Sequence, residues 1–130
     1  MIKHKLVWCS DDWLPYHFAF CPSARAWGEA DKRYHLDRAY PDHDACSIHF
    51  IDREGVSTTL VCVGEHVKSK RKVVGYLVHE GSHVWRQMRE AMGELTPSSE
   101  FEAYSLQAIV ERLIIAYEAS RGPLLIGGKR

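Results

Sequence analysis

Two histidines and a glutamate interrupt the apolar pattern of "VVGYLVHEGSHVWRQM", residues 73–88. At about 100° per residue, His79 and His83 fall together on one flank of the predicted helix. Side chains four residues apart have Cβ atoms roughly 5–6 Å apart, so two imidazoles can bind one metal ion at about 2.0–2.1 Å. Glu80 is rotated away from that ion but can reach a water in its open position, where a general base is needed.

The segment "HEGSH" satisfies H-E-x-x-H on a helix, the signature of zinc peptidases, and therefore predicts Zn²⁺ as the cofactor and Glu80 as the catalytic residue. The alternative is a purely structural histidine pair. The context favours the metal site, since the helix is amphipathic and a predicted β-hairpin precedes it. Gly81 costs this helix about 0.5–1 kcal/mol relative to alanine, which indicates a close backbone contact at that position.

A catalytic zinc ion needs a third protein ligand and one open position. The H-E-x-x-H-x-x-G-x-x-H pattern is excluded, because its last two positions are Arg86 and Arg89. Glu102 shares a helical stripe with Leu106, Ile109, Leu113 and Ala116, so an unpaired carboxylate there would be costly and a metal would neutralise it. A capping box, Ser99-x-x-Glu102, is the competing interpretation. Glu100 is the second candidate ligand.

The predicted fold class is α+β, in a single domain that spans residues 1–130. A small antiparallel β-sheet, formed by a hairpin at about 46–64 with "DREG" as its turn, packs on the helix that carries the motif. Helices are expected at about 24–34, 73–92 and 98–120. The last is expected to begin with Thr96 as its cap and Pro97 in its first position, and the helix at 73–92 to end at Gly93.

Composition narrows the classes of partner. The 17 basic and 17 acidic residues give no net charge, which disfavours binding to nucleic acid or to an anionic membrane. No apolar run approaches the roughly 18 residues that span a bilayer, and the N-terminus has no apolar signal-peptide region. Four irregularly spaced cysteines without a C-x-x-C pair indicate a reduced, cytoplasmic protein.

The four tryptophans are expected in the core: Trp8, Trp13, Trp27 and Trp85.

The motif with a glutamate in "EFEAY" resembles the gluzincin-type zinc peptidases, in particular the small ImmA/IrrE-like group and compact zincin-like proteins of bacteriophages and prophages. The resemblance covers about residues 46–117. It implies a minimal zincin-like fold, with His79, His83 and Glu102 as zinc ligands and Glu80 as the base. Leu106 replaces an aspartate that larger gluzincins often carry, and their transition-state donor has only candidate counterparts: Tyr76, Tyr104 and His66.

The predicted function is zinc-dependent hydrolysis of a peptide or protein substrate, with an extended peptide lying against an exposed hairpin strand. The alternative is a non-catalytic structural or interaction protein, such as a phage component, in which zinc stabilises the fold. A fourth protein ligand would favour this alternative, and His66, Cys62 and His49 are the candidates. A metal-free domain with coincidental histidines is the third possibility.

Overall fold

The computed structural model describes residues 1–10 and 16–124 and has an α+β architecture with one mixed sheet. The sheet order is β1-β2-β4-β3, with β2 parallel to β4 and the other two pairs antiparallel. The elements, in chain order, are β1 (Val7–Trp8), β2 (Tyr16–Cys21), α1 (Ala24–Tyr34), β3 (Ala45–Ile51), β4 (Ser57–Val63), α2 (Lys70–Ala91) and α3 (Ser99–Arg121).

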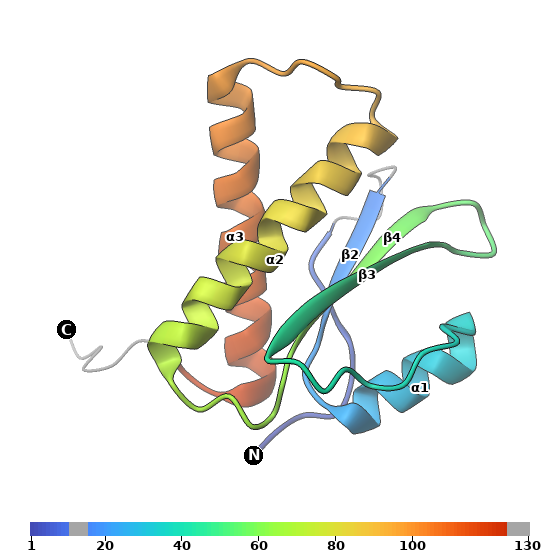
Figure 1. Ribbon diagram of the computed structural model, residues 1–130, viewed down its shortest axis with the longest axis vertical. Coiled ribbons are helices and arrows are strands. Elements are labelled where there is room, and N and C mark those ends of the chain that lie inside the picture. Colours follow the sequence, from blue (N-terminus) through green and yellow to red (C-terminus); the bar gives the residue numbers. More distant parts are fainter. Residues whose placement is uncertain (11–15, 125–130) are drawn as a thin grey trace.

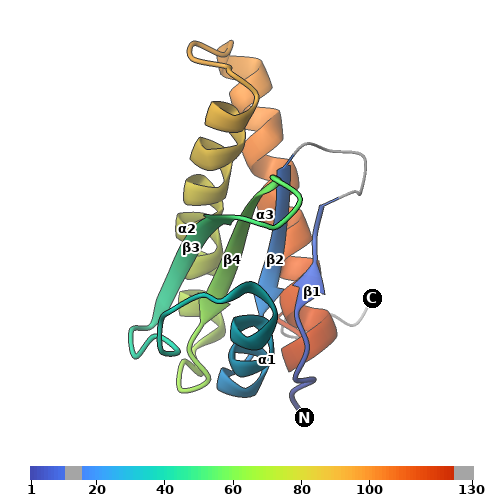
Figure 2. The ribbon, with the colours of Figure 1, turned by 90° about the vertical axis from the view of Figure 1, so that its right-hand side faces the viewer.

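The elements form three layers. Helix α1 covers one face of the sheet, and α2 and α3 cover the other (Figures 1 and 2). The main core lies between the sheet and the helix pair, where Phe18, Phe20 and Val61 meet Leu77 and Leu113. Alternate residues of the same strands face α1 in smaller apolar clusters. Because both faces are covered, β4 is buried almost along its whole length.

The predicted hairpin is confirmed as β3 and β4. Its turn is closed by Asp52, whose backbone N–H donates to Val56 and whose carboxylate accepts from the backbone of Glu54 and Val56, while Gly55 adopts φ of 81°. The prediction of an antiparallel sheet is wrong for the pairing of β2 with β4. The connection from β2 to β4 contains α1 and β3, and β3 runs antiparallel to both at the sheet edge, so β2 and β4 run in the same direction.

All three predicted helices are present, with shifted starts for the last two. Helix α2 begins three residues earlier than expected, because Ser69 caps it. Ser98, rather than Thr96, caps α3 by accepting from the backbone N–H of Phe101, so Pro97 precedes the helix. The capping-box interpretation of Glu102 is therefore wrong, since Glu102 lies one position past that of a capping-box glutamate. Gly93 has φ of 71° just beyond α2, as expected.

Trp27 and Trp85 are buried in the core, but Trp8 is 43% exposed and Trp13 lies outside the described residues. Among residues 1–10 and 16–124, none of the helices combines the length and the apolar character needed to cross a bilayer.

Candidate functional site

Helix α2 presents the motif at its middle, where it packs against both the sheet and α3 (Figure 1). The His79 and His83 rings lie together, with centroids 5.1 Å apart and planes at 72°. His79 is exposed and His83 is half-buried. One helical turn thus brings two imidazoles to a common region of surface, as the spacing predicts.

Glu80 is buried on the sheet side of α2, whereas His79 is exposed. The Glu80 side chain is only 4% exposed and turns toward the sheet, where it lines a cavity of about 450 Å³ beside the edge strand β3. His83 and Gln87 line the same cavity from α2, and His49 lines it from β3. A carboxylate, two imidazoles and an amide therefore line one cavity.

His49 is held in place by neighbours on the sheet. Its Nε2 lies 2.6 Å from the Ser57 hydroxyl, and its ring is parallel to that of Tyr16, with centroids 6.5 Å apart. Tyr16 in turn is buried and hydrogen-bonds Thr59, which also lines the cavity. Burial raises the pKa of Tyr16 far above its usual value, so this hydroxyl stays protonated and serves as a fixed hydrogen-bonding group.

Gly81, inside the motif, lies where α2 and α3 cross. A Cβ atom at this position would come within 3.1 Å of a Val110 methyl group and 3.6 Å of methyl groups of Ile109 and Leu113. The predicted close contact is therefore confirmed, and α3 supplies it. This contact fixes the distance between the helix with the histidines and the helix with Glu102.

Glu102 lies in the first turns of α3, and its stripe of Ile109, Leu113 and Ala116 is buried as predicted. Its Oε2 accepts a hydrogen bond of 2.8 Å from the indole Nε1 of Trp85. Ser82, Arg86 and Arg89 surround the two groups, on a different side of α2 from the cavity that Glu80 lines. Within residues 1–10 and 16–124, no three His, Cys, Asp or Glu side chains are grouped closely enough to hold a metal ion.

The donor types nevertheless fit zinc, which is bound by imidazole nitrogens and carboxylate oxygens. The structure brings His79 and His83 together, and it places Glu102 on the adjoining helix with one carboxylate oxygen on Trp85. Ligating carboxylates commonly accept such a hydrogen bond with the oxygen that does not bind the metal. Glu100, the second candidate, is exposed.

The candidate transition-state donors lie apart from the cavity around Glu80. Tyr76 Oη donates to Asp44 at 2.5 Å, and His66 Nε2 lies 2.8 Å from the other oxygen of that carboxylate. Tyr104 is 68% exposed on α3. Of the candidates for a fourth ligand, His66 is thus bonded to Asp44, His49 to Ser57, and Cys62 faces the α1 side of the sheet.

The helical pattern places Gln87, seven residues after Glu80, on the same flank of the helix, and it lines the cavity as that pattern predicts. Sequence reasoning gave no role to Arg38, which also lines the cavity beside Glu80. Arg38 lies in the connection from α1 to β3, and no local pattern in the sequence indicates its position.

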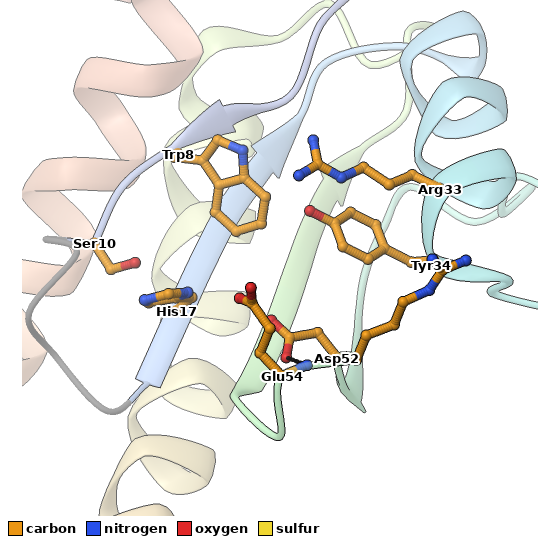
Figure 3. Close-up of a pocket in the computed structure, with 8 residues that line it drawn as sticks. Trp8, Ser10, His17, Arg33, Tyr34, Asp52 and Glu54 are labelled. Atoms are coloured by element: carbon orange, nitrogen blue, oxygen red, sulfur yellow. Dashed lines mark hydrogen bonds between the residues drawn. The ribbon is translucent and has the colours of Figure 1, made fainter.

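A second hollow, of about 410 Å³, lies on the α1 side of the sheet (Figure 3). Trp8, Tyr34 and His17 surround it, with Asp52 and Glu54 from the hairpin turn. The His17 Nε2 atom is buried there without a hydrogen-bond partner among the described residues. The sheet separates this hollow from α2, so its residues are not part of the site around Glu80.

Comparisons with protein-family models, with curated proteins and with solved structures found no match to this chain.

Proposed function

We propose that the protein is a minimal zinc metallopeptidase that cleaves an extended peptide bound along β3. The observation that carries the proposal is the arrangement on α2. His83, whose ring centroid lies 5.1 Å from that of His79, lines the same cavity at the sheet edge as Glu80, which is 4% exposed. General bases in hydrolases need this combination of a restricted environment and access to water.

His79 and His83 would hold the zinc ion, with Glu102 as the third ligand. The carboxylate of Glu102 would have to turn toward the histidines, and its hydrogen bond with Trp85 leaves Oε1 available for the ion. Bound zinc would supply a water of lowered pKa and polarise the scissile carbonyl group.

Glu80 would carry the proton. Its carboxylate would accept the proton of the attacking water and donate it to the amine nitrogen that leaves. The cavity holds this carboxylate among few other groups, with His83 and Gln87 from its own helix and His49 facing it from the sheet. His49 would orient the substrate carbonyl, since its ring lines the same cavity and is held by Ser57 and Tyr16.

The substrate would bind by adding a strand to the sheet. Strand β3 pairs only with β4 in the described sheet, so its outer edge offers unpaired backbone groups to an extended peptide. The same strand forms a wall of the cavity through Ser47 and His49. A peptide on this edge would therefore pass close to Glu80.

The substitution Glu80→Gln tests the proposal. It keeps the shape of the buried side chain but removes its ability to accept a proton, so we expect zinc to remain bound and peptide cleavage to fall by about 10²–10⁴-fold. Cleavage of a diverse peptide mixture by the zinc-loaded protein is measured by mass spectrometry. Glu90→Gln, at an exposed position of the same helix, is the control. Undiminished cleavage by the Glu80 variant, or no cleavage by the wild type, contradicts the proposal.

A further inference from the structure

Three of the four cysteines lie at the same level on three neighbouring strands. Cys21 of β2 is paired with Cys62 of β4 in the parallel register, and Cys46 of β3 is paired with Cys62 in the antiparallel register. All three thiols are free and face the α1 side of the sheet, where they pack with Ala26 and Trp27. We refer to Cys21, Cys62 and Cys46 as the cysteine row.

Burial falls steeply along the cysteine row. Cys21 and Cys62 are 0% and 2% exposed, whereas Cys46 is only half-buried because β3 is the edge strand. Cys46 also lines the cavity that holds Glu80, with Arg38 beside it. A small reagent that enters from solvent therefore meets Cys46 first.

The thiols also differ in acidity. A hydrogen bond from Cys62 lowers the pKa of Cys46, and the nearby Arg38 adds to this effect, while burial and the Glu80 charge oppose it. Contacts with Cys21 and Cys46, together with burial, raise the pKa of Cys62. Of these two thiols, Cys46 therefore ionises more readily, and Cys62 is the partner that touches it.

The backbone geometry allows a bond between these two residues. Directly opposed residues of an antiparallel pair have Cα atoms about 4.5–5.5 Å apart, within the range of about 4.4–6.8 Å found for disulfides. Cys9, by contrast, belongs to the core cluster on the other face of the sheet. Its thiol donates to the backbone oxygen of Val7.

We propose that Cys46 is a peroxide-reactive thiol and that Cys62 resolves it as a disulfide. The Cys46 thiolate attacks one oxygen of hydrogen peroxide, the O–O bond breaks, and the sulfur becomes a sulfenic acid while hydroxide leaves. The Cys62 sulfur then attacks the Cys46 sulfur, the S–O bond breaks, and a second hydroxide leaves and takes up the thiol proton as water. In total, two thiols are oxidised and one peroxide is reduced to two waters. This chemistry does not depend on the proposed peptidase activity.

The experiment treats the full-length protein with hydrogen peroxide, blocks the remaining thiols under denaturing conditions and digests it with trypsin without reduction. Cleavage after lysine and arginine places Cys46 alone in residues 39–53 and Cys62 alone in residues 54–68, whereas Cys9 and Cys21 share residues 6–25. We expect the number of thiols that can be blocked to fall from four to two. The cross-linked species should be residues 39–53 joined to residues 54–68.

Two variants separate this result from other outcomes. Cys46→Ser, at a half-buried edge position, should abolish the cross-link, and Cys9→Ala should leave it unchanged. A bond from residues 6–25 to residues 54–68 would assign the reaction to another cysteine and overturn the proposal. Oxidation of Cys46 to sulfinic acid without any cross-link would overturn it as well.

Discussion

Glu102 is the residue on which the proposed metal site depends most, because His79 and His83 would supply only two of the three ligands that a catalytic zinc ion requires. Its position on α3, facing α2, follows from the helical stripe that it shares with Ile109 and Leu113. The direction of its carboxylate does not follow from that stripe, since the hydrogen bond from Trp85 depends on how the two helices cross. Local periodicity therefore predicts on which face of α3 Glu102 lies, but it does not predict that Trp85 is the hydrogen-bond partner of its carboxylate.

The substitutions Glu102→Gln and Glu100→Gln distinguish the two candidate ligands. We expect Glu102→Gln to weaken zinc binding by at least about 10-fold, because a neutral amide is a much poorer ligand than a carboxylate. Glu100→Gln, at an exposed position two residues earlier, should leave the affinity unchanged. Zinc affinity is measured by competition with a chelating dye. Loss of affinity in the Glu100 variant alone would move the third ligand to Glu100.

At the scale of elements, the crossing of α2 and α3 at Gly81 fixes the distance between the helix that carries the histidines and the helix that carries Glu102. The hydrophobic pattern predicted both helices to within one residue at their ends, except at the start of α2, which Ser69 caps three residues earlier. The hairpin was equally predictable, because its turn chemistry and alternation are local. The parallel pairing of β2 with β4 was not predictable, since it joins segments on either side of α1 and no local pattern encodes it.

Substitution of Gly81 tests the importance of this crossing. Gly81→Val adds methyl groups where a single Cβ atom would already approach Val110 to 3.1 Å, so we expect the free energy of unfolding to fall by about 1–3 kcal/mol. Gly75→Ala, in open space on the same helix, should instead raise it by about 0.5–1 kcal/mol through helix propensity. Urea denaturation measures both. A Gly81→Val protein as stable as the wild type would show that α3 is free to move away.

At the scale of the whole molecule, Asp44 connects three parts of the chain. It precedes β3, accepts a hydrogen bond from Tyr76 of α2, and pairs with His66 in the connection between β4 and α2. The hydrogen bond from Tyr76, followed by that from His66, lowers the pKa of the Asp44 carboxyl. Tyr76 and His66 were both expected as transition-state donors. Through Asp44, Tyr76 instead joins the start of the edge strand to the motif helix, and His66 joins it to the connection that precedes this helix.

The lowered pKa of Asp44 predicts a pH-dependent contribution to stability. A carboxyl whose pKa is lower in the folded state stabilises that state above its unfolded pKa of about 3.9, and this stabilisation is lost as the pH falls through the folded value. We therefore expect Asp44→Asn to unfold at lower urea concentration than the wild type at pH 7, with the difference shrinking below about pH 4. Asp42→Asn, at a fully exposed neighbour, serves as the control. A difference that persists undiminished at pH 3 would contradict this account.

The most direct test of the central claim is the metal content of the purified, zinc-equilibrated wild-type protein, combined with X-ray absorption spectroscopy of the bound ion. The proposal predicts about one zinc per chain, with two imidazole nitrogens, one carboxylate and one solvent oxygen in its shell. His83→Ala should retain almost none. A wild-type protein that binds no zinc, or one whose zinc shell lacks histidine, would contradict the assignment of His79 and His83 as a metal site.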